Sequence, residues 1–76
     1  MEENLAMDAE RDPRIDPQPG DVIEHGGIRV EVDSIENGEV YYCKVNDAKG
    51  TWQLCRISLS AWPEAAKNAA VERTIV

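Results

Sequence analysis

The sequence predicts a mainly β fold, a small SH3-like barrel of about five strands with one short C-terminal helix. Three observations lead to this prediction. The chain has 76 residues, enough for a single small domain. Apolar and polar side chains alternate between residues 28 and 33, as they do in half-buried strands. Two turn signals, Asn37-Gly38 and the sequence DAKG at residues 47–50, separate the strand-like segments.

The first part of the chain, residues 1–19, is expected to form an acidic, proline-containing N-terminal arm, and residues 20–76 the barrel domain. Residues 1–11 are rich in helix formers but have few apolar positions, so we expect a frayed helix or disorder there, outside the core. The arm continues with DPRIDPQPGD, in which each proline lacks a backbone donor and favours extended geometry in the residue before it. We therefore expect this second part of the arm to be ordered or semi-ordered and not helical.

The first hairpin is centred on Asn37-Gly38, because both central residues of a type I′ turn need a positive φ angle. The preceding strand carries apolar residues at every second position: Ile28, Val30 and Val32. With this turn, Val32 should pair with Cys43 and Val30 with Val45, which makes one face of the hairpin apolar.

The second hairpin is expected at residues 47–50, where a type I turn is followed by a glycine in the left-handed region. This turn sets Cys43 opposite Cys55. The first register makes Cys43 hydrogen-bonded to the strand on one side, and the second register makes it hydrogen-bonded to the strand on the other side. The two registers therefore conflict by one residue. A bulge or a one-residue slip must therefore intervene.

The predicted helix lies near residues 61–69, capped by Ser58 or Ser60. Ser60 is preferred, because it places Pro63 in the first turn, where the missing donor costs nothing. Trp62 is the expected core anchor. At helical spacing one face carries the apolar residues Trp62, Ala65, Ala66 and Ala69. The β-branched side chains of residues 71–76 predict a short closing strand.

The formal net charge is −7, and it is distributed unevenly. Residues 1–40 hold twelve acidic and three basic residues, whereas residues 41–76 hold three acidic and five basic ones. Such a chain is repelled by phosphate backbones, so general nucleic-acid binding is not expected. The sequence has no apolar run of about 20 residues and no signal-peptide pattern at its start, so we expect a cytoplasmic protein without a membrane partner.

Candidate chemistry is sparse. In a reducing compartment Cys43 and Cys55 are expected to be free thiols that fill apolar space, with a cross-strand disulfide as the alternative. Together with His25 they lack the spacing of a metal site, so neither a metal nor another cofactor is expected. His25 lies in a polar loop, and no nucleophile can be tied to it by spacing. We therefore predict no catalytic residues and no enzyme activity.

The registers above place a second set of large side chains on the face opposite Val30 and Val32. Tyr42, Trp52 and Leu54 are aromatic or apolar, and Ile35 and Val40 accompany them. Together with two cations they form the predicted protein-binding set: Tyr42, Trp52, Leu54, Lys44 and Arg56. The competing interpretation is that the barrel, the arm or the helix covers these residues. A separate acidic surface is expected along the first hairpin, from Glu31, Asp33, Glu36 and Glu39.

The sequence DPRIDPQPGDVI, a Gly-Gly turn, a strand pair containing VYY and a late Trp before an Ala-rich helix together resemble small proteins of unknown function encoded by bacteriophages and prophages. The likeness covers about residues 12–71. The PGD followed by apolar residues is also similar to the entry of the first strand in SH3-like and KOW-type small barrels. What the phage resemblance implies is a context in which small acidic proteins inhibit host enzymes or defence systems by binding them.

The expected function is therefore a non-enzymatic phage-type protein, a monomer or homodimer, that binds and modulates a host protein. It would use the protein-binding set or its acidic half, the latter by mimicry of nucleic acid. The alternative is a small barrel that binds single-stranded nucleic acid, with bases stacked on Tyr42 and Trp52 and phosphates held by Lys44, Lys49 and Arg56. Steep salt dependence of binding would distinguish the alternative from the first function.

Overall fold

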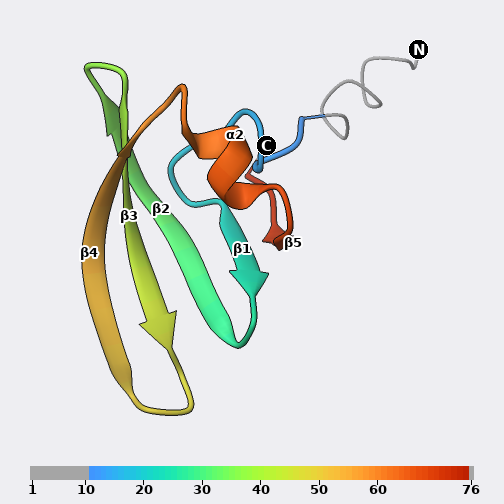
Figure 1. Cartoon of the computed structure of the whole chain (residues 1–76), viewed down its shortest axis with the longest axis vertical. Helices are drawn as coiled ribbons and strands as arrows, with labels where there is room; N and C mark the ends of the chain where they lie inside the picture. Colours follow the sequence, from blue (N-terminus) through green and yellow to red (C-terminus); the bar gives the residue numbers. More distant parts are fainter. Residues whose placement is uncertain (1–10, 76) are drawn as a thin grey trace.

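A computed structural model describes residues 11–75 of the chain, so most of the frayed helix or disorder expected for residues 1–11 lies outside the described residues. Within the described part, five strands and one short helix follow one another (Figure 1). The elements are β1 (Val22–His25), β2 (Ile28–Glu36), β3 (Glu39–Asn46), β4 (Thr51–Ser58), α2 (Trp62–Ala66) and β5 (Ala70–Arg73). The predicted mainly β class is confirmed.

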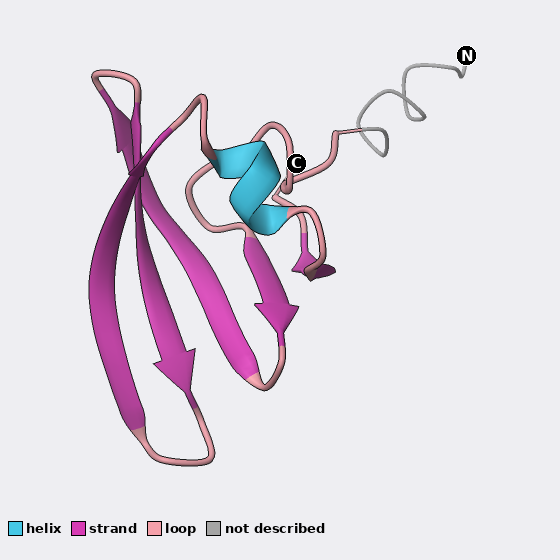
Figure 2. Cartoon of the chain, in the orientation of Figure 1, coloured by secondary structure: helices cyan, strands magenta, loops and turns pink. Residues whose placement is uncertain are grey.

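The strands form one antiparallel sheet in the order β4-β3-β2-β1-β5. The first four strands are joined by consecutive hairpin turns. The chain then passes through α2, and β5 returns beside β1 (Figure 2). The outer edges of the sheet are β4 and β5. The face of the sheet that packs against α2 is called the inner face below, and the opposite face the outer face.

Both predicted turns are present. Asn37 and Gly38 have φ angles of 53° and 76°, as a type I′ turn requires. At the second turn Gly50 has a φ of 69°, and its backbone N–H donates to the Asn46 carbonyl oxygen at 2.8 Å. Since Asn46 pairs with Thr51, Asp47 belongs to the loop rather than to the strand. The loop is thus one residue longer than predicted, and Cys55 pairs with Tyr42 instead of Cys43.

A register shift between Val32 and Ser34 leaves Asp33 as an extra residue in β2. On the turn side of this bulge the predicted register holds, with Ile35 opposite Val40. Beyond it Val32 pairs with Tyr42 and Val30 with Lys44, so the predicted pairs Val32–Cys43 and Val30–Val45 are both wrong. The longer second loop, and not this bulge, removes the conflict between the two predicted registers, because it sets Cys55 opposite Tyr42 instead of Cys43.

This bulge also changes which side chains share a face. Because side chains alternate along a strand, the shift brings Ile35, Val40 and Tyr42 onto the same side as Val30 and Val32. The prediction that these three residues point away from the valines is wrong. They belong to the core or pack against it instead.

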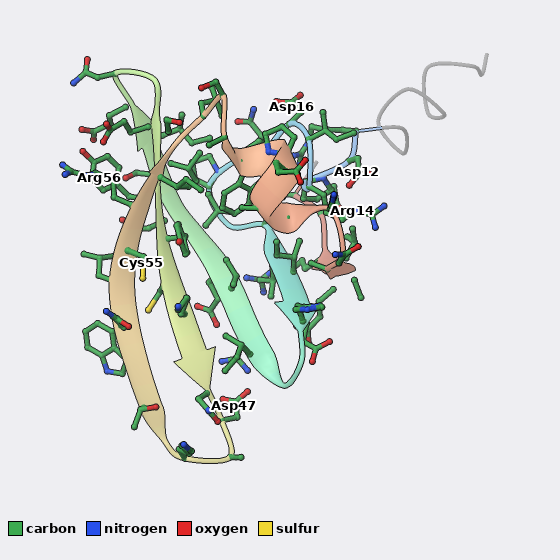
Figure 3. All side chains as sticks on the ribbon, viewed as in Figure 1. Asp12, Arg14, Asp16, Asp47, Cys55 and Arg56 are labelled. Carbon is green, nitrogen blue, oxygen red and sulfur yellow. The ribbon has the colours of Figure 1, made fainter. Side chains whose placement is uncertain are left out.

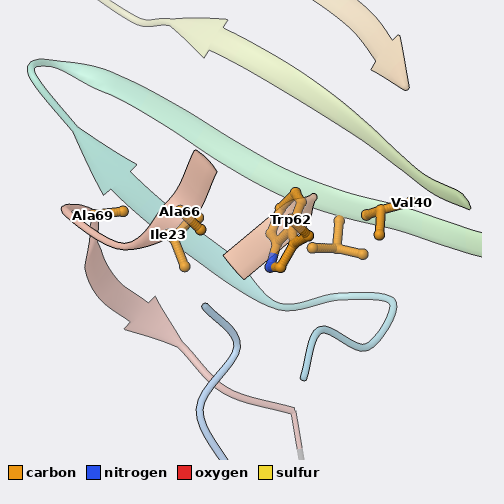
Figure 4. Packing of buried hydrophobic residues seen from close by; sticks show 6 residues of the cluster. Ile23, Val40, Trp62, Ala66 and Ala69 are labelled. Carbon is orange, nitrogen blue, oxygen red and sulfur yellow. The ribbon is translucent and has the colours of Figure 1, made fainter. Parts of the chain in front are cut away.

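The core lies between the inner face of the sheet and α2, as Figure 4 shows. Its buried members are Ile23, Val32, Val40, Trp62, Ala66 and Ala69. Trp62 is 3% exposed and donates its indole N–H to the Pro13 carbonyl oxygen at 2.8 Å, which confirms it as the core anchor. Ala65 was expected on the buried face of the helix, but it is exposed, because it lines an open groove beside the sheet.

The start of α2 differs from the prediction. The helix is shorter than the predicted residues 61–69. Its N-cap residue is Ala61, and among the described residues no side chain makes a capping hydrogen bond there. Pro63 does lie in the first turn. The Ser58 hydroxyl accepts a hydrogen bond from the Ala61 N–H at 3.2 Å, so Ser58 and not Ser60 orders the approach to the helix.

The described part of the arm packs against the domain. Pro13 and Pro17 are fully buried, and the Arg14 guanidinium donates to the Ala69 carbonyl oxygen at 3.1 Å (Figure 3). Arg14 is also paired with Asp12 at 2.9 Å. Residues 11–19 therefore pack against residues 20–75.

The arm is joined to both ends of the domain through Asp21, which is fully buried. Its carboxylate accepts hydrogen bonds from both terminal nitrogens of Arg11, at 2.6 and 3.0 Å, and from the backbone N–H groups of Gln18 and Ile75, at 2.8 and 2.7 Å. Burial alone would raise the pKa of Asp21, but these donors hold the pKa below its ordinary value. We call these four residues the Asp21 clasp.

Candidate functional site

The two faces of the sheet divide the predicted protein-binding set. Tyr42 lies on the inner face, where its ring meets that of Trp62 edge to face with centroids 5.6 Å apart. Lys44 shares its side, two residues along β3. Trp52, Leu54 and Arg56 alternate on the outer side of β4, opposite residues of β3 that face the same way. Only these three of the five predicted residues can contact one partner on the outer face.

The outer face carries an apolar cluster, and only part of this cluster belongs to the predicted protein-binding set. Cys43 pairs with Leu54 and Val45 with Trp52, so four side chains form two adjacent cross-strand pairs. Trp52 is 69% exposed and Leu54 is 60% exposed, while Cys43 and Val45 beside them on β3 are half-buried. We call Cys43, Val45, Trp52 and Leu54 the outer patch.

Charged groups border the outer patch on the side of β2. The Arg29 guanidinium donates to Glu31 at 2.8 Å and to Asp47 at 2.5 Å, and both Arg29 and Glu31 pair with β3 residues of the patch side. At the far end Arg56 lies 3.3 Å from Glu39 and pairs across the strands with Tyr41. An aromatic and apolar centre with a charged rim is the usual composition of a protein-binding surface.

The acidic residues predicted as a surface are spread along the first hairpin. Glu31 and Glu39 contact arginines, as described above. Asp33 is the exposed bulge residue, and Glu36 lies opposite Glu39 beside the turn. Because two of the four carboxylates are partly neutralised by ion pairs, they do not form a continuous negative surface.

The strand β4 contributes its backbone as well as its side chains. The Leu59 N–H donates to the Gly38 carbonyl oxygen at 2.7 Å, in the same pairing frame as β3 and β4. In an antiparallel ladder the hydrogen-bonded residues alternate, so the odd-numbered residues of β4 bond to β3. The N–H and C=O groups of Trp52, Leu54, Arg56 and Ser58 therefore point away from the sheet, and no strand within residues 11–75 pairs with them.

An open groove lies on the inner face between α2 and the sheet. Its volume is about 320 Å³, and it is lined mainly by apolar side chains, with His25 and Lys44 also contributing. Burial raises the pKa of Tyr42, which lines the groove, and the neighbouring Cys55 raises it further. A second hollow of about 290 Å³, beside the second turn, is lined by residues that include Lys44, Lys49 and Trp52.

These positions bear on the nucleic-acid alternative. Trp52 is on the outer side of β4 and Tyr42 is packed against Trp62, so the two aromatic rings cannot stack on successive bases of one strand. Lys44 and Lys49 meet at the second hollow, but Arg56 lies toward the other end of β4. The constellation that this alternative requires is not assembled.

The residues considered for chemistry are also apart. Cys43 belongs to the outer patch, whereas Cys55 pairs with Tyr42 on the inner side, so the two thiols point to opposite faces. The ring Nδ1 of His25 lies 3.2 Å from the Asn68 carbonyl oxygen. Among residues 11–75, no three His, Cys, Asp or Glu side chains come together as metal ligands.

Comparisons with known proteins add no further information. No family model matches the chain, and no curated protein and no solved structure matches it either. In the described part of the chain, the helix is too short to cross a membrane. The candidate site therefore rests on the geometry of the outer patch.

Proposed function

We propose that this chain is a non-enzymatic protein-binding module and that its partner binds on the outer patch. In the setting implied by the phage resemblance, the partner is a host protein whose activity the binding modulates. The observation that carries the proposal is the pair of neighbouring, mostly exposed apolar side chains, Trp52 and Leu54. Neighbouring large apolar residues on the open face of a sheet are typical of surfaces that bind a partner.

The surroundings of the patch support a protein partner over a small ligand. The outer patch is a surface on two neighbouring strands, and the two hollows described above lie elsewhere or only at its border. Trp and Arg are enriched among the residues that dominate binding energy at protein interfaces, and Trp52 and Arg56 flank Leu54 on the same strand face. The half-buried Cys43 and Val45 extend the apolar surface from Trp52 and Leu54 across to β3.

The distribution of perturbed side chains supports a role without catalysis. In an enzyme, groups with shifted pKa values cluster at the reaction site. Here the carboxylates with lowered pKa values are Asp12 and Asp21, which are ion-paired to Arg14 and Arg11 in the packed arm. These shifts are explained by structural ion pairs.

The proposal is tested by affinity capture from a lysate of the host, comparing the wild type with the double variant Trp52→Ser/Leu54→Ser. We expect a specific captured protein to be lost with the double variant, because the variant removes the apolar centre and leaves the core unchanged. Ile15→Ser is the matched control, since Ile15 is 64% exposed but lies in the arm. A partner retained by the double variant would contradict the proposal, as would a partner lost equally with the control.

A further inference from the structure

We propose that the open edge of β4 pairs with β4 of a second copy of this chain, so that one continuous antiparallel sheet runs through a symmetric dimer. This inference does not rest on the proposed function. Edge pairing uses backbone groups of β4, whereas the proposed host partner contacts side chains of the outer patch. The pairing would place two outer patches side by side on the same face of one sheet.

The first argument is that β4 lacks the features that keep edge strands apart. It is eight residues long and pairs with β3 without a register shift. Its sequence TWQLCRIS contains no proline, no lysine and no glycine, and its single charge is Arg56. Proteins protect a free edge with a short strand, a bulge, a proline or a lysine, and an edge without them pairs with another strand.

The opposite edge of the sheet shows the contrast. The strand β5 has four residues, AVER, two of which are charged, and a register irregularity interrupts its pairing with β1. Two of the protective features, a short strand and an irregular register, are thus present at the β5 edge and absent at the β4 edge. The asymmetry indicates that β4 is the edge adapted to pairing.

The second argument is that β4 is complementary to itself. A two-fold axis perpendicular to an antiparallel pair places one residue opposite its own copy. Leu54 lies between Trp52 and Arg56 on the outer side of β4. In the dimer it would lie opposite Leu54 of the other copy. In this register Trp52 of each copy lies opposite Arg56 of the other copy, with one such pair on each side of the axis.

This register combines favourable contacts and avoids like charges. The two leucines form an apolar cross-strand pair, and each guanidinium lies over an indole ring, which is a favourable cation–π arrangement. The two Arg56 side chains are separated by four residues along the strands, about 13 Å at the usual rise. Much of the net charge of −7 comes from residues 1–40, whereas β4 itself has one positive charge, so charge repulsion at the paired edges is small.

A second copy fits this edge better than an unrelated extended peptide, because the match on the outer side comes from the sequence of β4 itself. Pairing of two eight-residue strands is a small interface, and small interfaces give weak, reversible association. The dimer should therefore form in a concentration-dependent way, with a Kd roughly between 1 μM and 1 mM.

The test is sedimentation equilibrium of the full chain over that concentration range, near physiological ionic strength. We expect the average mass to rise toward that of a dimer for the wild type and for Ile15→Lys. Leu54→Lys should weaken association by about tenfold or more, because two lysines would lie directly opposite each other. Both substitutions add one positive charge at a side chain of similar exposure, 60% and 64%, so overall charge is controlled.

A second measurement on the wild type needs no substitution. In amide hydrogen exchange by NMR, the N–H groups of Trp52, Leu54 and Arg56 should gain protection as concentration rises, while those of Gln53 and Cys55 are protected throughout. A wild-type protein that remains monomeric over the whole range would overturn the inference. So would a Leu54→Lys variant that associates as the wild type does, or protection that rises elsewhere and not at β4.

Discussion

The Asp21 clasp makes a quantitative prediction about stability. Asp21→Asn keeps the size of the side chain but replaces one carboxylate oxygen by an amide NH₂. Each oxygen of Asp21 accepts two hydrogen bonds, one from Arg11 and one from a backbone N–H of Gln18 or Ile75. The substitution therefore sets an NH₂ group against two donors and leaves the Arg11 guanidinium without its counter-charge.

The expected loss follows from these contacts. Breaking a buried ion pair by removing one partner costs about 3–5 kcal/mol. The lower part of this range applies here, because the Arg11 side chain is 17% exposed and keeps some contact with water. A chain of 76 residues has a free energy of unfolding of roughly 4–11 kcal/mol, so Asp21→Asn should remove a large part of the total stability.

Urea unfolding at neutral pH, followed by the fluorescence of the buried Trp62, measures this loss. The matched control is Asp47→Asn, the same substitution at an ion pair whose carboxylate side chain is 63% exposed, and it should cost about 1 kcal/mol or less. Equal and small losses in both variants would refute the reasoning about the clasp.

The same clasp determines how stability depends on pH. The pKa of Asp21 is lower in the folded chain than the roughly 3.9 of a free aspartate, so the unfolded chain binds the proton more readily. Its contribution is therefore fully present above about pH 4 and is lost as the pH falls through the folded pKa. The wild type should lose stability steeply in acid, and Asp21→Asn should lose less.

Three further predictions concern the core, the first turn and the thiols. Trp62→Ala should lower the free energy of unfolding in urea by about 3–5 kcal/mol, and Trp62→Phe by less, although both lose the hydrogen bond to Pro13. An unchanged unfolding midpoint for the alanine variant would show that the indole of Trp62 does not anchor α2. Gly38→Ala should lower the free energy of unfolding by about 1 kcal/mol or more, because its φ of 76° is strained for alanine; a neutral variant would contradict the type I′ turn. Mild oxidation of the native protein should give no bridge between Cys43 and Cys55 by mass spectrometry, since they point to opposite faces; such a bridge in the native protein would contradict the register.

Local sequence signals predicted most of the fold. Asn37-Gly38 and the glycine of the second turn need left-handed backbone, which few residues adopt readily, so their positions were predicted correctly. Trp62 is predictable as the core anchor because it is the one large apolar residue of a short helix. The exact length of the second loop was not predictable, since turns of three and four residues share the same composition.

The main error of the sequence-based prediction is that it lacks the bulge at Asp33, although the sequence contains a signal for it. Val32 and Ile35 are three residues apart, whereas strict alternation would place an apolar residue at Ser34. Two inward-facing residues at that spacing require one extra residue between them. Without the bulge, Tyr42 was assigned to the outer face and included in the protein-binding set.

The Asp21 clasp had no comparable signal. Two of its three donor residues, Arg11 and Ile75, lie 10 residues before Asp21 and 54 residues after it, and nothing in the local sequence links them to Asp21. Cys43 and Val45 were likewise missed as part of the outer patch, because their face depends on the same register. The part of the site that was predicted, Trp52 with Leu54 and Arg56, depends only on alternation within one strand.

The proposal that the outer patch binds a partner is tested most directly by site-specific photo-crosslinking in host cells. A photoreactive amino acid is placed at position 52, in the outer patch, and in a second variant at position 15, in the arm. We predict a covalent adduct with one particular host protein from position 52 and not from position 15, because only the first position would lie within the interface. An adduct with the same protein from position 15 alone, or no adduct from position 52 in cells where the partner is captured, would contradict the account.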